Sequence, residues 1–142
     1  MIKENNTLGI IRALRKDARM NMVDLAKATN LSRAVVFRRL KYIENNFVKK
    51  YTSLVDFSKT EYKVRAVIYI SSNGKRLAAF LKKNPHINSA FSLSGRFDFM
   101  IEVFFRNLSD LASFEDRLHP YCTCTRTHFI VEEIKMEDAC AA

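Results

Sequence analysis

The sequence is short of the residues that several classes of functional site require. Three glycines in 142 residues provide no glycine-rich loop that could cradle phosphates. No apolar run approaches the ~20 residues that a membrane-spanning helix needs, and residues 1–6 lack the apolar core of a signal peptide. We therefore expect a cytoplasmic protein with no membrane partner.

The three cysteines, Cys122, Cys124 and Cys140, are an odd number and form no disulfide framework. Cys122 and Cys124 are two residues apart on an expected strand, so their sulfurs should lie on one face. They could form a thiol redox or metal site, or they could be two small buried side chains. Metal binding needs more ligands, and the spacing of His119 and His128 matches no zinc pattern, so we favour buried cysteines. We also expect no cofactor and no enzymatic activity, because no nucleophile–base pair or paired-carboxylate motif is recognisable.

Positive charge is concentrated in the first third of the chain. The formal net charge is +9, and residues 1–50 hold twelve Lys and Arg against four Asp and Glu, a net +8. Residues 51–142 hold twelve against eleven, a net +1. Phosphates attract Lys and Arg without regard to sequence, so this asymmetry favours a polyanion as the partner of the N-terminal part. A solvated basic surface is the alternative that charge alone leaves open.

Residues 32–44, SRAVVFRRLKYIE, have the pattern of a DNA-recognition helix. Val36, Leu40 and Ile43 recur at i, i+4 and i+7, so they share one face of a helix. Ser32 can cap this helix, because its hydroxyl accepts a hydrogen bond from a free amide of the first turn. The basic residues project elsewhere, as a helix in the major groove requires.

The preceding segments complete a helix-turn-helix. Residues 21–29 predict a short helix capped by Asn21, and Asn30 suits a left-handed position in the turn. Residues 7–16 predict a first helix capped by Asn6 or Thr7, and Asn46 is expected to end the recognition helix in a left-handed cap. The expected core of the three helices is Ile11, Leu14, Leu25, Val36, Leu40 and Ile43.

The expected contacts with double-stranded DNA are of two kinds. Side chains on the outer face near the start of the recognition helix should reach base edges, where Arg is suited to guanine; these are Arg33, Ala34, Phe37 and Arg38. Basic residues around them should bind phosphates; these are Arg39, Lys41, Lys49 and Lys50. Ser32, at the start of the helix, completes the expected site.

The remainder of the chain alternates strands and helices. Strands are expected at 64–71, 87–93, 97–105 and 123–136, helices at 75–83 and 108–118, and a hairpin turn at 94–96. The order βαββαβ is that of a ferredoxin-like sandwich. The fold class is therefore α+β, with a three-helix helix-turn-helix domain at 1–47, a linker or strand at 48–62, the βαββαβ domain at 63–137 and a frayed tail at 138–142.

One expected strand is apolar on both faces. In residues 97–105 one face carries Phe97, Phe99, Ile101, Val103 and Phe105, and the other carries Met100 and Phe104 around Glu102. Two helices cover only one side of a four-stranded sheet. The second face therefore needs a partner, most simply another copy of the chain, which would place two recognition helices about one DNA turn (~34 Å) apart.

A basic helix-turn-helix followed by a βαββαβ domain resembles the Lrp/AsnC (feast/famine) family of prokaryotic transcription regulators over essentially the whole chain. The likeness is carried by residues 17–19 (DAR), 25–26 (LA), 31–32 (LS), 39–44 (RLKYIE) and 95–98 (GRFD), and by Thr125 and Thr127 before residues 134–135 (IK). The chain departs from the family where Asn30 and Asn46 replace the usual glycines and where Thr7 stands in place of an acidic residue.

The resemblance implies a homodimer built on the β domain, often assembled into larger rings, which binds operators with paired helix-turn-helix units. It also implies an amino-acid effector, a small molecule held between protomers near the turn of Gly95, Arg96, Phe97 and Asp98. Gly95 allows a ligand to approach the main chain, whose amides could hold a carboxylate, while Asp98 could hold an ammonium group. Thr125 and Thr127 could add hydroxyl contacts if the last strand borders this site.

Alternatives remain open at this point. Asp98 could instead be a structural residue that caps the hairpin, and Arg96 could form a salt bridge across the interface, which leaves a site that needs no ligand. For the whole chain, the alternative to a sequence-specific DNA-binding transcriptional regulator is a small-ligand-binding oligomeric module whose helix-turn-helix does not bind DNA. The uneven charge favours the regulator.

Overall fold

The structure, a computed structural model, describes residues 4–72 and 76–137. The described residues form two compact units. One consists of residues 4–54 and 135–137, and the other of residues 55–72 and 76–134. The expected tail at 138–142, with Cys140, and the expected first residue of the fourth helix, Lys75, lie outside the described residues. None of the described helices is both long and apolar enough to cross a membrane.

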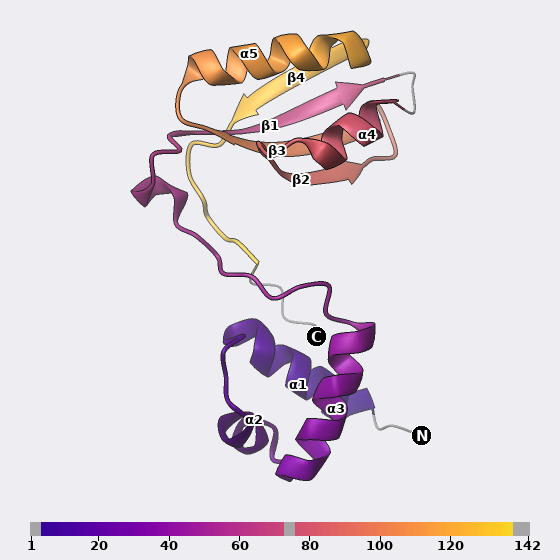
Figure 1. Ribbon diagram of the computed structural model, residues 1–142, viewed down its shortest axis with the longest axis vertical. Coiled ribbons are helices and arrows are strands. Elements are labelled where there is room, and N and C mark those ends of the chain that lie inside the picture. Colours follow the sequence, from indigo (N-terminus) through magenta and orange to yellow (C-terminus); the bar gives the residue numbers. More distant parts are fainter. Residues whose placement is uncertain (1–3, 73–75, 138–142) are drawn as a thin grey trace. The chain divides into compact units, whose positions relative to one another are not determined.

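The N-terminal unit contains three helices, α1 (Glu4–Lys16), α2 (Met22–Thr29) and α3 (Arg33–Asn46) (Figure 1). Asn21 caps α2 as expected, because its side-chain oxygen accepts hydrogen bonds from the amides of Val23 and Asp24, each at 3.0 Å.

The turn between α2 and α3 has the predicted geometry. Asn30 adopts the left-handed conformation, with φ 53°, which Asn tolerates better than most residues. Ser32 then caps α3, with its hydroxyl oxygen 3.4 Å from the amide of Val35. The predicted helix-turn-helix is therefore confirmed.

The two remaining cap predictions for this unit are wrong. Helix α1 begins at Glu4, so Asn6 and Thr7 lie inside it, and an acidic residue does stand in its first turn. Asn46 remains helical at the end of α3, and its side-chain amide donates to the carbonyl of Tyr42 at 2.8 Å. A left-handed residue is unnecessary there, because the amides of Phe47 and Val48 both bond to the carbonyl of Ile43.

The core of this unit is centred slightly differently from the prediction. Ile10 is fully buried, whereas Ile11 and Leu14 only pack against the core from its edge. Leu25, Val36 and Ile43 are fully buried as expected, and the remaining buried member is Ala13. The fully buried stripe of α3 fixes which side of that helix is left for solvent.

Of the two alternatives expected after α3, a linker or a strand, the structure shows a linker. Residues 48–56 have no regular secondary structure, and a single 3-10 turn, η1 (Phe57–Lys59), follows them. A strand needs a hydrogen-bonded neighbour, and none is present for this segment in the described residues.

The second unit is a four-stranded antiparallel sheet with two helices. Its elements in chain order are β1 (Val64–Ser71), α4 (Arg76–Lys83), β2 (Ile87–Ser92), β3 (Phe99–Phe105), α5 (Leu108–Leu118), η2 (His119–Tyr121) and β4 (Cys124–Phe129). The strand order is β2-β3-β1-β4, with β1 paired to both β3 and β4. This is the predicted ferredoxin-like arrangement.

Both helices cover the same face of the sheet (Figure 1). Strand residues on that face are buried against apolar residues of α4 and α5; the fully or almost fully buried set is Ala66, Ile68, Ile70, Leu77, Leu81, Ile101, Val103, Phe105, Leu111, Phe114 and Leu118. Asn107 caps α5 and accepts from the amide of Asp110 at 2.9 Å. We call the opposite side of the sheet the open face.

Three strands are shorter than predicted, and β2 differs least, because it ends at Ser92 instead of Leu93. β4 ends at Phe129 instead of residue 136: its last pair with β1 is Ala66 with Phe129, and one further bond runs from Ile130 N–H to Arg65 C=O. β1 begins at Val64, so it offers no partner to the last residues of the expected strand. β3 begins at Phe99 instead of Phe97, because the preceding residues belong to the turn.

Candidate nucleic-acid interface and effector site

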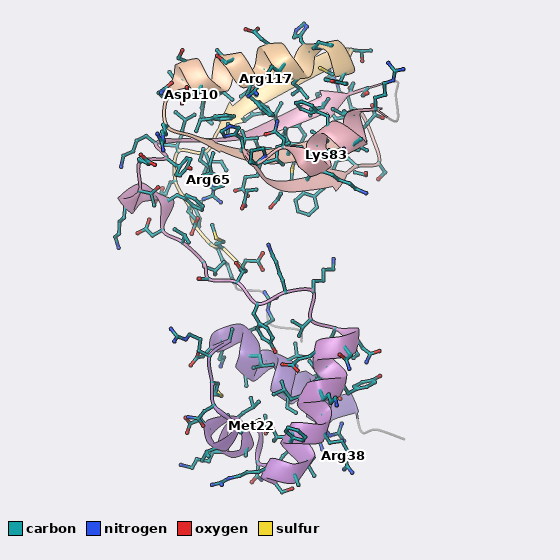
Figure 2. The ribbon with its side chains drawn as sticks, viewed as in Figure 1. Met22, Arg38, Arg65, Lys83, Asp110 and Arg117 are labelled. Atoms are coloured by element: carbon teal, nitrogen blue, oxygen red, sulfur yellow. The ribbon has the colours of Figure 1, made fainter. Side chains whose placement is uncertain are left out.

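The outer side of α3 carries a continuous exposed stripe. Ala34, Phe37, Arg38 and Lys41 recur at i, i+3, i+4 and i+7, on the side opposite the buried Val36. Phe37 is 65% exposed although it is a large apolar side chain. Figure 2 shows Arg38 on the side of α3 that faces away from α2. An apolar side chain flanked by cations, on a capped helix, suits the edges of bases between two phosphate backbones.

Arg33 and Ser32 lie at the start of this stripe. Both are exposed, and the Ser32 hydroxyl is engaged with the first turn of the helix. Lys49 and Lys50 follow α3 and are also exposed. The structure therefore brings together on one helix most of the residues predicted to contact DNA, with the two lysines just beyond its end.

Arg39 is placed differently from the other basic residues of α3. It is half-buried, and its guanidinium donates to the hydroxyl of Thr7 at 3.2 Å, which links α3 to α1. Thr7 is itself 7% exposed. The sequence had suggested a phosphate contact for Arg39, but the side chain lies on the inner side of the helix and fixes the position of α3.

The open face of the sheet carries several apolar side chains. Val67 and Tyr69 of β1 lie beside Glu102 and Met100 of β3, and Phe91 of β2 lies opposite Met100. Phe91 is 52% exposed, and the others are half-buried. None of these residues belongs to the core that α4 and α5 form with the sheet in the described part of the chain.

One end of the open face is covered from within the chain. The ring of Phe57 stacks on that of Phe104, with centroids 3.9 Å apart, and Phe104 is only 6% exposed. The guanidinium of Arg65 lies 5.3 Å from the centre of the Phe104 ring. The sequence placed Phe104 on a surface that needs a partner, and this part of the prediction is wrong because Phe57 provides the cover.

Arg65 is the centre of a polar cluster on the same end of the open face. It contacts Glu102 and Glu133, each at 2.6 Å, and Asn88 donates to Glu102 at 2.7 Å. Burial acts to lower the pKa of the Arg65 guanidinium, but hydrogen bonds to Glu133 and Glu102 outweigh it and raise the pKa. The ion pair between Arg65 and Glu133 joins the segment around Glu133 to the sheet.

The turn between β2 and β3 is held by backbone bonds. The amide of Leu93 donates to the carbonyl of Asp98 at 2.8 Å, and the amide of Asp98 donates to Ile70 at 2.9 Å. Gly95 has φ +138°, a conformation that side chains other than hydrogen rarely allow. Within the described chain, the amides of Gly95 and Arg96 have no backbone partner, and both residues are exposed.

Asp98 has a structural role. One of its carboxylate oxygens accepts from the amide of Ser72 at 2.8 Å, while the Ser72 hydroxyl donates to the carbonyl of Tyr121 at 2.7 Å. The guanidinium of Arg96 lies over the ring of Phe97, which in turn contacts Tyr69 on the open face. No ion pair involves Arg96 within the described residues.

Thr125 and Thr127 are not brought together with this turn. They pair with Ile70 and Ile68 and lie on the helix-covered face, whereas the ring of Phe97 lies on the open face. The Thr127 hydroxyl donates to the carboxylate of Glu115 in α5. Their side chains therefore point away from the turn within one protomer.

The cysteines do not share one face of a strand as expected. Cys122 precedes β4 and is half-buried, with its thiol near the carbonyl of Leu118 at 3.3 Å. Cys124 is exposed, so the expectation that both are buried is wrong. Burial, with the charge of Cys124, raises the pKa of the Cys122 thiol. The described residues contain no group of His, Cys, Asp or Glu that could hold a metal.

Comparison with known proteins agrees with this architecture. The sequence profile of the Lrp/AsnC ligand binding domain matches residues 65–140, and that of a winged helix-turn-helix DNA-binding domain matches residues 3–41. The HTH-type transcriptional regulator LrpC of Bacillus subtilis is 28% identical over 89% of this chain and 90% of its own.

Solved structures show the same likeness over nearly the whole chain. The structure of B. subtilis LrpC has a TM-score of 0.86 at 27% identity and covers 95% of this chain and 99% of that one. The transcriptional regulator NMB0573 of Neisseria meningitidis, in complex with L-Met, has a TM-score of 0.84 at 25% identity and covers 96% and 94%. This chain is a DNA-binding transcriptional regulator with a ligand-binding domain, and it belongs to the Lrp/AsnC family.

Proposed function

We propose that the exposed stripe of α3 reads the operator sequence. The observation that carries this proposal is the exposure of Phe37 and Arg38 on the helix side opposite the buried core. Arg38 can bind guanine through two hydrogen bonds, a contact that gives ~1–3 kcal/mol of discrimination. Ala34 and Phe37 offer apolar contacts to thymine methyl groups.

Lys41, Lys49 and Lys50 bind phosphates in this proposal, and Arg33 reaches a base edge from the start of the helix. Arg39 acts by positioning α3, because its bond to Thr7 holds it on the inner side. Phosphate contacts strengthen binding to all sequences alike and make it salt-dependent. As a regulator that acts on DNA in a prokaryote, the protein would work in the cytoplasm.

Selection of bound sites from random double-stranded DNA, followed by sequencing, tests this role. We expect an enriched motif. For each phosphate contact, the logarithm of the association constant should fall by about 0.9 when the salt concentration rises tenfold. Recovery of no motif, together with salt-independent binding, would leave the helix-turn-helix as a protein-packing element and refute the proposal.

The open face is proposed to pair two copies of the chain. Val67, Tyr69, Phe91 and Met100 form an uncovered apolar surface on one side of the sheet, and a two-fold contact between identical surfaces is the commonest way to bury one. Larger rings of such dimers are compatible with the free sheet edges. Two α3 helices about one DNA turn (~34 Å) apart would select an inverted repeat.

Met100→Asp tests the pairing, because Met100 is central on this surface and its partner in β1 is Tyr69. A carboxylate buried without a partner costs ~3 kcal/mol or more, so we expect the dimer dissociation constant to rise about a hundredfold or more. Ala112→Asp, on the exposed side of α5, adds the same charge elsewhere and should leave the dimer intact. Sedimentation that shows the unmodified chain as a stable monomer at micromolar concentration would contradict the proposal.

The effector is proposed to be an amino acid held at the turn of Gly95, Arg96, Phe97 and Asp98. The free amides of Gly95 and Arg96 suit a carboxylate, and Asp98 retains a second oxygen for an ammonium group. The proposal leaves out Thr125 and Thr127, because the sheet separates them from the turn. The L-Met complex of the Neisseria relative supports this ligand class.

Calorimetry against the twenty amino acids tests the effector. Asp98→Asn keeps an oxygen that can accept from Ser72 but removes the charge, so amino-acid binding should weaken about tenfold or more while the fold is retained. If no amino acid binds at millimolar concentration, or if Asp98→Asn binds as the original does, the turn is only structural.

A further inference from the structure

Helix α4 presents side chains that neither DNA binding nor the open face uses. Arg76, Ala79, Phe80 and Lys83 recur at i, i+3, i+4 and i+7 and so lie along one side of the helix. A different side of α4 enters the core, where Leu77 and Leu81 are buried. Figure 2 labels Lys83 at the C-terminal end of this helix.

This side of α4 borders a pocket of about 480 Å³, a volume within the range of small-molecule sites. Asn84 and Pro85, which follow α4 in the chain, and Tyr121 of η2 complete the lining. The rings of Phe80 and Tyr121 stack with centroids 4.9 Å apart and an interplanar angle of 24°. The pocket therefore has an aromatic wall that a planar ring can pack against.

Arg76 and Lys83 are the charged residues in the pocket lining. Across the residues that the structure describes, neither forms an ion pair, whereas Arg65 and Arg106 of the same unit do. Seven helical positions separate the two cations, a distance of ~10 Å along the axis. Among the described residues, no carboxylate lines the pocket, so a carboxylate ligand would meet a guanidinium, but an ammonium group would meet no opposite charge.

We propose that this pocket binds an aromatic carboxylate that carries no ammonium group. The ring packs against the aromatic wall of Phe80 and Tyr121, Arg76 holds the carboxylate with two hydrogen bonds, and Lys83 supplies a second positive charge at the far end. The site is distinct from the turn at Gly95–Asp98, whose carboxylate favours a ligand with an ammonium group. It does not depend on how α3 reads DNA.

The two regions are connected through Ser72, which bonds to Asp98 by its amide and to the carbonyl of Tyr121 by its hydroxyl. A ligand at the turn could therefore disturb signals of Tyr121 without entering the pocket. Substitutions in the pocket itself are needed to decide where a ligand binds.

Titration of the full chain with 3-phenylpropanoate, by calorimetry and by NMR of the Tyr121 ring, tests the proposal. This probe is phenylalanine without its ammonium group. We expect saturable binding at millimolar concentration or below, and binding of phenylalanine at the pocket at least about tenfold weaker, because its ammonium group is left without a partner. Equal affinity for both ligands, or no saturation, would overturn the proposal.

Two variants locate the site. Arg76→Gln should weaken 3-phenylpropanoate about tenfold or more, because a hydrogen bond to a charged group is lost, while Lys82→Gln, one residue before Lys83 and outside the lining, should leave it unchanged. Ala79→Leu fills the pocket at an exposed helical position and should block binding without loss of helicity by circular dichroism. Unchanged affinity in Arg76→Gln or in Ala79→Leu would show that the ligand binds elsewhere and refute the assignment.

Discussion

Phe37→Ala should weaken binding to the selected operator more than binding to random DNA. The side chain is 65% exposed in the free protein, so about two thirds of its surface remains to be buried against DNA. Full burial of a Phe side chain contributes ~1.5–3 kcal/mol, which leaves ~1–2 kcal/mol for the DNA contact. The dissociation constant for the operator should therefore rise about 5- to 30-fold.

The same reasoning names the group that Phe37 contacts. Apolar side chains in the major groove recognise the C5-methyl group of thymine. Replacement of that thymine by deoxyuridine removes one methyl group, which is worth ~0.8 kcal/mol when buried, or about fourfold in affinity. This loss should appear with the original protein and be absent with Phe37→Ala.

Fluorescence anisotropy, with each thymine of the half-site replaced in turn, measures this double-mutant cycle. Phe47→Ala is the matched control, because Phe47 is also an exposed aromatic, 56% exposed, but lies after α3 against Tyr42. That variant should keep the methyl effect in full. If every thymine gives the same loss in Phe37→Ala as in the original protein, Phe37 does not read a methyl group.

Two further predictions concern stability and thiol chemistry. Asn30→Ala should lower the free energy of unfolding, measured in urea, by ~1–2 kcal/mol, because alanine is strained at φ 53°. Asn30→Gly should leave this free energy nearly unchanged. Equal losses in the two variants would exclude backbone strain as the cause. At pH 8, Cys122 should react with iodoacetamide more slowly than Cys124, because its raised pKa leaves less thiolate. Mass spectrometry of single-cysteine variants measures the two rates. A faster reaction of Cys122 would contradict the prediction.

Local patterns in the sequence predicted most of the fold. The caps Asn21 and Ser32, and the left-handed Asn30, are properties of short segments and were found where the sequence placed them. β1 and α5 have the predicted bounds for the same reason. Strand ends were less predictable, because the end of β4 at Phe129 depends on its pairing with β1, which is distant in sequence.

The candidate sites could also be predicted only where they depend on local sequence. Helical periodicity was enough to place Phe37 and Arg38 on the outer side of α3. It could not show that Arg39 turns inward to Thr7, 32 positions earlier in the chain. The cover of Phe104 by Phe57 and the pocket beside Phe80 and Tyr121 likewise arise from contacts between distant segments.

The most direct test of the account compares Arg38→Ala and Lys50→Ala on the selected operator and on random DNA in the same salt. Arg38→Ala should lower the ratio of specific to non-specific affinity about tenfold, because a bidentate contact to guanine is lost. Lys50→Ala should weaken both DNAs by the same factor and reduce the salt slope by about one unit. Equal loss on both DNAs in Arg38→Ala would contradict the claim that the outer stripe of α3 reads the operator.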